Sequence, residues 1–333
     1  MTSPRTVPEP RPLLGTMKAA AIDRFGPPAV LTLHTIPIPQ PGPGEVLIAL
    51  HGAGVGVWDA EMRAGTYPTG KERFPLVLGT DGAGIVAARG DRVRRFEVDD
   101  RVWAYEFGDP QGGFYAEFVA VNAEHVGPAP ESLTLLEAGA SAVTGLTALQ
   151  GVEDLELREG EHVLIFGATG AVGTLAVQFA KLRGARVIGT ATGRDAIHLV
   201  TDLGADATVD GRSNQVAEQL RALAPRGLDA VLALAGGENL ERCLDLVRSG
   251  GRIAYPNGVE PEPKHRPKVR AVAYDAVAGP KEFAELNEAV ETCQLRVVIA
   301  GVYPLERAAE AHEGVERGHV IGRLAIRVRD HSR

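Results

Sequence analysis

The stretch Val163-Leu-Ile-Phe-Gly-Ala-Thr-Gly-Ala-Val-Gly173 decides the fold, because it leads an apolar strand through three spaced glycines into a helix. Val163 to Phe166 are β-branched, aliphatic or aromatic, as in a parallel strand that is buried on both faces. Apolar residues then recur at helical spacing, at Val172, Leu175, Ala176 and Phe179. The sequence therefore predicts a strand that turns sharply into a helix at Gly170.

Each glycine of this turn has its own physical role. Gly167 allows the tight turn, Gly170 lets the backbone approach a diphosphate, and Gly173 lets the helix pack closely. The free N–H groups and positive dipole end at the helix start then face the phosphates. A purely structural glycine turn is the alternative, but strand, turn and helix together favour a dinucleotide site. The residues predicted to contact the cofactor here are Gly167, Ala168, Thr169, Gly170, Ala171, Val172 and Gly173.

The end of the second strand, Ala185–Ala191, indicates which dinucleotide is bound. A carboxylate at this place would accept hydrogen bonds from an unmodified ribose. Here Thr192 and Arg194 offer a hydroxyl and a guanidinium instead. A charge-assisted bond from Arg194 to a 2′-phosphate contributes about 1.5–3 kcal/mol, so NADPH is predicted. The alternative is that Arg194 is a solvated residue paired with Asp195.

Composition and charge exclude several classes of function. The 333 residues suffice for two domains, and a formal net charge of −8 argues against a nucleic-acid surface. Cys243 and Cys293 are the only cysteines and lie far apart, which supports neither a disulfide framework nor a zinc motif. There is neither an apolar run of membrane-spanning length nor a signal-peptide core. We expect a cytoplasmic protein with a small-molecule substrate and no membrane partner.

The pattern of the chain changes twice. Residues 1–16 read as a flexible tail, and residues 17–138 contain short strands separated by Gly and Pro, as in a partly open β-barrel. Residues 139–279 alternate strand and helix, which predicts a doubly wound α/β domain that binds NADPH. The remaining residues are predicted to complete the first domain with a helix at 282–293, a strand at 295–299, a helix at 305–317 and a last strand at 323–328.

Several further motifs accompany the glycine turn. They are Pro41-Gly-Pro-Gly-Glu-Val46, the segments 75–84 and 112–118, Gly145-Leu-Thr-Ala148, and the segments 303–312 and 318–323. With these motifs the chain resembles the medium-chain dehydrogenase/reductase superfamily, and within it the zinc-independent, zeta-crystallin-like quinone oxidoreductases. The resemblance implies a GroES-like catalytic domain, a Rossmann domain and a homodimer. It assigns the dimer contact to the edge of the nucleotide-domain sheet, for which residues 268–274 are a candidate, unless that strand is covered.

The positions of the metal ligands in zinc-dependent relatives are altered. Such relatives carry a cysteine within the segment 53–59 and a histidine where this chain has Thr80, and the third position, near Val143, is apolar. The four-cysteine structural-zinc lobe is also missing, and His51, His125 and His162 lack metal-ligand spacing. We therefore expect no metal site.

Without a metal, a hydride from the nicotinamide must go to an acceptor that is already activated, such as a quinone or an α,β-unsaturated carbonyl. The resemblance assigns Thr147 to the nicotinamide amide, and a tyrosine that matches Tyr67 to the substrate site. Tyr67 is the candidate proton donor, although it could instead pack beside Pro68. Arg323 is also predicted to contact the cofactor.

The substrate end departs from the family pattern. Quinone oxidoreductases usually carry asparagine where this chain has Gly56, and often tyrosine where it has Glu61. Trp58 adds bulk and a stacking face, so Gly56, Trp58 and, more weakly, Tyr105 are predicted to contact the substrate. Asp59 is predicted either to position substrate or water in catalysis, or to cap a helix or form a salt bridge.

These departures leave two other functions open. One is an enoyl or alkenal reductase of a biosynthetic pathway. The other is an NADPH-binding sensor or structural protein whose redox chemistry is dispensable.

Overall fold

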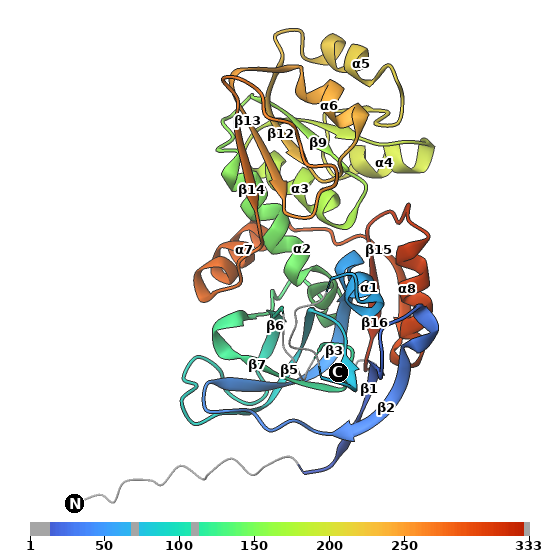
Figure 1. Ribbon diagram of the computed structural model, residues 1–333. Helices are drawn as coiled ribbons and strands as arrows, with labels where there is room; N and C mark the ends of the chain where they lie inside the picture. The colour runs from blue at the N-terminus through green and yellow to red at the C-terminus, as the bar shows by residue number, and fades with distance from the viewer. Residues whose placement is uncertain (1–13, 68–72, 108–112, 330–333) are drawn as a thin grey trace, which may run out of the picture.

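The computed structural model describes residues 14–67, 73–107 and 113–329. Figure 1 shows two lobes, a mixed α/β lobe above and a β-rich lobe below, joined by the long helix α2 (Leu135–Asp154). Most of the predicted tail, residues 1–16, lies outside the described residues, and Thr16 already belongs to strand β1 (Thr16–Ile22).

The α/β lobe is built on a six-stranded sheet whose paired strands are all parallel, in the order β11-β10-β9-β12-β13-β14. The chain runs outward from β9 in one direction and then, from β12, in the other, which is the doubly wound pattern that the sequence predicts. Its strands are β9 (His162–Phe166), β10 (Arg186–Thr190), β11 (Ala207–Val209), β12 (Leu228–Ala233), β13 (Val247–Pro256) and β14 (Arg270–Tyr274). Its helices are α3 (Ala171–Leu182), α4 (Arg194–Asp202), α5 (Val216–Leu223) and α6 (Glu238–Leu244).

The turn between β9 and α3 matches its predicted form. Gly170 is the N-cap of α3 in extended backbone, and Gly167 has a φ of +98°, a conformation that favours glycine. Gly184, also left-handed at +74°, follows the helix end. The strand, the turn and the helix are therefore confirmed.

The β-rich lobe holds a seven-stranded sheet, in which β15-β16-β3-β5-β6-β8 pair in order and β7 pairs with β3, and a three-stranded sheet ordered β2-β1-β4. The last strand, β16, returns to this lobe as predicted and pairs antiparallel with β3, with Leu324 opposite Val55. Its remaining strands are β2 (Thr32–Pro37), β3 (Glu45–Val55), β4 (Leu76–Val77), β5 (Asp81–Arg89), β6 (Arg101–Tyr105), β7 (Phe118–Asn122), β8 (Val126–Pro128), β15 (Ile299–Pro304) and β16 (Arg323–Arg327). Its helices are α1 (Val57–Ala64) and α8 (Ala308–Glu316), with 3-10 turns at 28–30, 123–125 and 305–307.

Helix α2 carries the site between the lobes. Thr134 and Glu137 form a capping box at its start, and most of its side chains are buried. The helix packs against α3 of one lobe and against β3 and β5 of the other. The predicted domain limit at residue 138 falls inside this helix, and the residue limits of the two domains stay a prediction.

One predicted strand is wrong. Residues 295–298 form no strand, and β15 begins only at Ile299. The Gln178 amide of α3 accepts the N–H of Arg296 at 2.9 Å and donates to its carbonyl at 3.0 Å, so a side chain takes the bonds that a strand neighbour would make. The predicted helix at 305–317 is likewise a 3-10 turn followed by α8, and α7 spans Pro280–Cys293.

One cluster of buried apolar side chains fills the β-rich lobe, and another joins α2 to the α/β lobe and also takes in Ala83 and Trp103 of the β-rich lobe. In the part of the chain that the structure describes, no helix is both long and apolar enough to cross a bilayer.

Candidate active site

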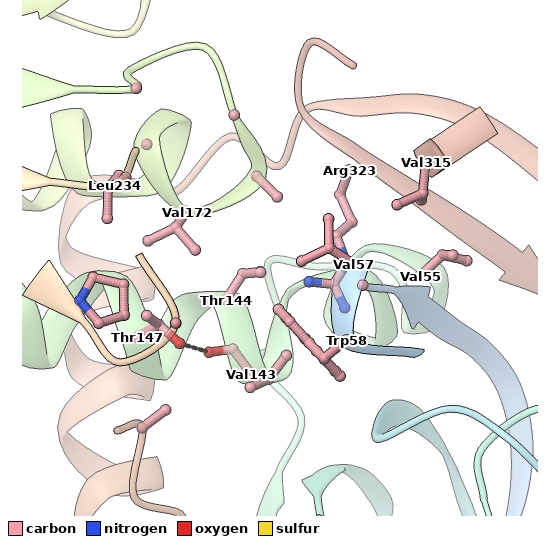
Figure 2. A pocket seen from close by; sticks show the side chains of 18 of the residues that line it. Val55, Val57, Trp58, Val143, Thr144, Thr147, Val172, Leu234, Val315 and Arg323 are labelled. Carbon is pink, nitrogen blue, oxygen red and sulfur yellow. Dashed lines mark hydrogen bonds between the residues drawn. The ribbon is translucent and has the colours of Figure 1, made fainter. Parts of the chain in front are cut away.

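A cavity of about 680 Å³ lies between the lobes. It runs from the glycine turn and the carboxyl ends of β9 and β12, along α2, to α1 and β16. This is where a doubly wound sheet binds its ligand, because the strand order reverses between β9 and β12. Figure 2 shows Leu234 and Val172 at one end and Trp58, Val57 and Arg323 at the other.

The glycine turn forms one wall of the cavity. Gly167, Gly170, Ala171, Val172 and Gly173 all line it. A side chain on Gly173 would lie 2.1 Å from the carbonyl oxygen of Gly167, so this glycine is needed for the turn to close. A Cβ on Gly170 would meet only that same oxygen, at 3.5 Å, so the space in front of Gly170 is open. Gly167 is further held by its N–H, which donates to Thr190 Oγ1 at 2.7 Å.

Four of the residues that are predicted to contact the cofactor are not among those that line the cavity. Ala168 is buried, and the carbonyl of Thr169 accepts the N–H of Gly322 at 2.8 Å. Thr192 donates its hydroxyl to Asp210 Oδ1 at 2.5 Å, and Arg194 is the exposed first residue of α4. Their roles toward a cofactor stay predictions.

A loop of the β-rich lobe covers the glycine turn. Gly318, His319, Val320 and Gly322 line the cavity, and Gly322 pairs with Gly170 in a short parallel bridge. Arg212, which follows β11 in the other lobe, donates from Nη2 to His319 Nδ1 at 2.8 Å. The loop is therefore bonded to the nucleotide lobe at two points.

Thr147 lies on α2 and lines the cavity below Val172 in Figure 2. Its hydroxyl donates to the carbonyl of Val143 at 2.8 Å, one turn earlier, and therefore keeps its lone pairs for a donor in the cavity. The Tyr274 hydroxyl donates to the Thr147 carbonyl at 2.9 Å and ties this turn of α2 to β14.

The far end of the cavity is aromatic. Trp58, Tyr67, Tyr105 and Phe107 line it, and the rings of Tyr67 and Phe107 pack edge to face with centroids 5.7 Å apart. Tyr67 is 48% exposed, so its hydroxyl is accessible to a ligand. Burial raises the pKa of Tyr105 to about 12, so this phenol stays protonated at neutral pH. Trp103, by contrast, is fully buried against Phe283 and is a core residue.

Glycine at position 56 makes room for the Trp58 indole. A Cβ on Gly56 would lie 2.4 Å from Cε2 of that ring. The indole Nε1 donates to Thr80 Oγ1 at 2.7 Å. In this orientation, Trp58 therefore requires glycine at position 56.

Arg323 is buried and paired. Its Nη2 donates to Asp81 Oδ1 at 2.8 Å, and its guanidinium carbon lies 5.2 Å from the centroid of the Trp58 ring. Asp81 also accepts the N–H of Val143 at 3.2 Å. Burial raises the pKa of Asp81, and the charge of Arg323 opposes that rise. Arg323 lines the cavity, as the predicted cofactor contact requires, but most of its surface is covered by protein.

Asp59 is buried behind the cavity wall. Its Oδ2 accepts the N–H of Gly56 at 2.7 Å and the Tyr115 hydroxyl at 3.0 Å. It is fully buried and is not among the described residues that line the cavity. Burial raises its pKa to about 7, and the bond from Gly56 opposes the rise. The structure thus gives Asp59 a helix-capping role, and a catalytic role stays a prediction.

Two of the positions that match zinc ligands in zinc-dependent relatives make other contacts here. Thr80 is bonded to Trp58, and Val143 presents an apolar side chain to the cavity. Across residues 14–67, 73–107 and 113–329 no group of three or more His, Cys, Asp or Glu side chains could hold a metal ion.

Sequence reasoning missed part of the lining. Leu234 follows β12, Pro256 to Val259 end and follow β13, and Asp275 and Ala276 follow β14. Their position after parallel strands is a signal that could have found them, because ligands bind at the carboxyl ends of such strands. Nothing local in the sequence marks Phe107, which reaches the site through long-range contacts.

Comparison with known proteins agrees with this geometry. Residues 42–131 match the alcohol dehydrogenase GroES-like domain family, and residues 203–326 match a family described as zinc-binding dehydrogenase. The quinone oxidoreductase of Mus musculus is 31% identical over 317 residues, which cover 91% of this chain and 95% of that protein.

Two solved structures are similar over nearly the whole chain. An NAD-dependent alcohol dehydrogenase has a TM-score of 0.87 at 31% identity, covering 94% of this chain and all of that one. A mycobacterial protein complexed with NADPH has a TM-score of 0.82 at 29% identity, with the same coverage. The chain is therefore an oxidoreductase that belongs to the zeta-crystallin-like quinone oxidoreductase family of the medium-chain dehydrogenase/reductase superfamily.

Proposed function

We propose that the protein is an NADPH-dependent reductase of quinones or α,β-unsaturated carbonyls that works without zinc. One observation carries the proposal: the same cavity is lined by the glycine turn at one end and by Trp58, Tyr67 and Tyr105 at the other. A nicotinamide dinucleotide laid along it from Gly170 brings its reactive ring to Thr147 and a flat acceptor to the aromatic end.

The cavity fits such a cofactor. The open space in front of Gly170 and the N-terminus of α3 suit a pyrophosphate, and Thr147 can accept from the nicotinamide amide. When bound, the cofactor supplies a hydride from C4 of its nicotinamide. The mouse relative is named a quinone oxidoreductase, which supports the same acceptor class for this chain.

The protein's own residues would then hold the acceptor and supply a proton. The apolar wall of Val57, Trp58 and Phe107 excludes water from a planar acceptor and favours stacking. The Tyr67 hydroxyl is the candidate donor to the acceptor oxygen that gains charge as the hydride arrives. Asp59 acts indirectly, by holding the start of α1, which carries Trp58.

The proposal of a zinc-free reaction rests on the donors present. Zinc requires several N, S or O ligands that converge tetrahedrally. Trp58, Thr80 and Val143 occupy the relevant part of the site and offer no such set. We expect treatment with a metal chelator to leave quinone reduction unchanged, and a loss of activity that Zn²⁺ restores would contradict this part of the proposal.

The preference for NADPH rests on Arg194 and Thr192. Arg194 is exposed at the start of α4, where its charge and the helix terminus would both attract a 2′-phosphate. The negative charge of Asp210, which is bonded to Thr192, would repel a 2′-phosphate. A relative complexed with NADPH supports the preference, although another relative is NAD-dependent.

The test is a matrix of cofactors and acceptors. Purified protein should oxidise NADPH faster than NADH with naphthoquinones or enones, and should not oxidise simple alcohols. Turnover with one particular enoyl or alkenal substrate, and none with quinones, would favour the biosynthetic reductase. Tight NADPH binding without turnover on any acceptor would favour the sensor or structural role.

Tyr67→Phe tests the proton donor separately. The variant keeps the ring that packs against Phe107 and removes only the hydroxyl. We expect kcat to fall on carbonyl acceptors, and an unchanged rate on every accepted substrate would rule out an essential donor.

We also propose a homodimer through β14. This strand is at one edge of the six-stranded sheet, and Arg270, Ala271 and Ala273 are exposed on it. Ala271→Pro would remove a backbone donor that points away from β13 at the open edge, and should yield monomers in analytical ultracentrifugation.

A further inference from the structure

The Trp58 indole is held in place by polar contacts at the substrate end. Two contacts hold this side chain, and one glycine leaves room for it. Gly56 leaves the space beside the ring, Thr80 accepts its N–H, and Arg323 lies against its face. Figure 2 shows the indole edge-on, with the guanidinium of Arg323 above it.

The room beside the ring depends on glycine. Any side chain at position 56 would begin 2.4 Å from Cε2 and 2.6 Å from Cζ2 of the indole, closer than real contacts allow. Gly56 has an extended backbone, so its conformation alone does not require glycine. The requirement comes from the indole.

The direction of the ring depends on Thr80. Its hydroxyl oxygen is 2.7 Å from the indole nitrogen and its side chain is buried at the start of β5. An indole N–H in a partly buried site needs an acceptor, because leaving it without one costs free energy. Thr80 therefore fixes the indole in the one orientation that satisfies its donor.

The second contact is between Arg323 and the face of the ring. Arg323 cannot move away from it freely, because its Nη2 is bonded to buried Asp81. A cation held over an indole face stabilises that arrangement. The ring therefore occupies the space that Gly56 leaves, and is held there by the hydrogen bond to Thr80 and by Arg323 against its face.

We propose that Thr80 and Gly56 determine acceptor specificity by locking Trp58 as a fixed wall, which admits planar acceptors and rejects acceptors with substituents out of the plane. Thr80 is a positioning residue in this scheme, since it acts through Trp58. The inference rests on the proposed quinone or enone reductase function. It names the residues that set which members of that substrate class are accepted.

The test uses both kinetics and the fluorescence of Trp58. The chain has only two tryptophans, and Trp103 is fully buried, so quenching by acrylamide reports mainly on Trp58, with Trp58→Phe as the assignment control. In Thr80→Val the indole loses its acceptor. We expect Trp58 to become more accessible to the quencher, and KM for a planar naphthoquinone to rise roughly three- to tenfold with a smaller change in kcat.

Two further variants separate positioning from folding. Thr80→Ser keeps the acceptor oxygen and should restore both the quenching and the KM. Thr292→Val removes a hydroxyl bonded within α7, away from the cavity, and should change neither.

A double variant tests Gly56. Gly56→Ala alone should raise KM and alter quenching, because its methyl group displaces the ring. Gly56→Ala with Trp58→Leu should behave as Trp58→Leu alone, which should also accept acceptors with bulky out-of-plane groups.

Two results would overturn the inference: unchanged quenching and KM in Thr80→Val, or equal damage from Gly56→Ala whether or not Trp58 is present. Failure of the reductase function itself would appear differently, as absence of turnover in the unmodified protein while the quenching changes persist.

Discussion

The two ends of the cavity are built in different ways. The cofactor end is made of backbone from one short segment, residues 167–173, whose glycines contact one another. The substrate end is made of side chains from α1, the start of β5, α2 and β16, which are distant in sequence. The first is encoded locally and tolerates little variation, whereas the second depends on compensating residues and can be changed as a set.

The largest expected effect is a loss of stability when the buried ion pair at the substrate end is broken. Asp81→Leu leaves Arg323 as an unpaired buried charge against the face of Trp58, and leaves the N–H of Val143 without its acceptor. We expect a loss of about 3–5 kcal/mol in the free energy of unfolding, measured by urea denaturation.

An exposed pair gives the matched control for Asp81→Leu. Glu306→Gln removes the partner of Lys18 at the surface, and should cost less than about 1 kcal/mol. Similar losses for the two variants would mean that the buried pair does not hold the substrate end together.

The second prediction concerns the pH dependence of stability. The pKa of Asp59 is about 7 in the folded protein because of burial, above its ordinary value of 3.8. The folded state therefore binds the Asp59 proton more tightly, and the stability from this group is fully present below about pH 4 and is lost as pH rises to about 7. We expect Asp59→Asn to remove this decline.

A second buried group, His312, also makes stability depend on pH, so the unmodified protein must be compared with Asp59→Asn. Burial lowers the pKa of His312 to about 3, so its contribution is lost as pH falls below its ordinary value of 6.5, which is the opposite slope. Since His312 is present in both proteins, the difference between their unfolding free energies at pH 5 and pH 7.5 isolates Asp59. A difference that does not change with pH would show that Asp59 is ionised throughout.

The third prediction separates two roles within the cofactor end. Gly173→Ala places a methyl group 2.1 Å from the Gly167 carbonyl and should destabilise the fold by about 1–3 kcal/mol. Gly170→Ala has room and should leave the melting temperature nearly unchanged, but its methyl group would stand where the pyrophosphate is expected, so Kd for NADPH should rise. If both variants lowered stability equally, Gly173 and Gly170 would not have separate roles in closing the turn and in leaving room for the pyrophosphate.

The smallest expected effect concerns cofactor preference. Arg194→Ala should lower the ratio of kcat/KM for NADPH to that for NADH roughly tenfold, through the loss of one charge-assisted bond. Arg186→Ala, at another exposed arginine of the same lobe, is the control. A ratio that stays the same in Arg194→Ala would remove this residue from the site.

The difference between the two ends also explains what the sequence could predict. The glycine turn, the doubly wound sheet and the return of β16 follow from local patterns of apolar and glycine residues. The strand predicted at 295–299 is wrong because the Gln178 amide, more than a hundred residues away, takes the backbone bonds of Arg296.

The same limit applies to individual site residues. Asp59 could not be assigned from sequence because its role depends on Tyr115 and on burial. The link between Gly56 and Trp58 required the distance between them, although both positions were marked as unusual. Local signals predict the glycine turn at the proposed cofactor end, and long-range contacts determine what surrounds the proposed substrate end.

The position of β16 has a consequence for synthesis on the ribosome. This strand lies between β3 and β15. Residues 52–55 of β3, beyond the part that pairs with β7, therefore have no strand neighbour on that side until residue 327 has left the ribosome. The strands of the α/β lobe, in contrast, all lie between residues 162 and 274. The α/β lobe can therefore assemble while translation continues, whereas the β-rich lobe begins first in sequence and is completed last, with an open sheet edge that a chaperone or a second nascent chain can engage in the interval.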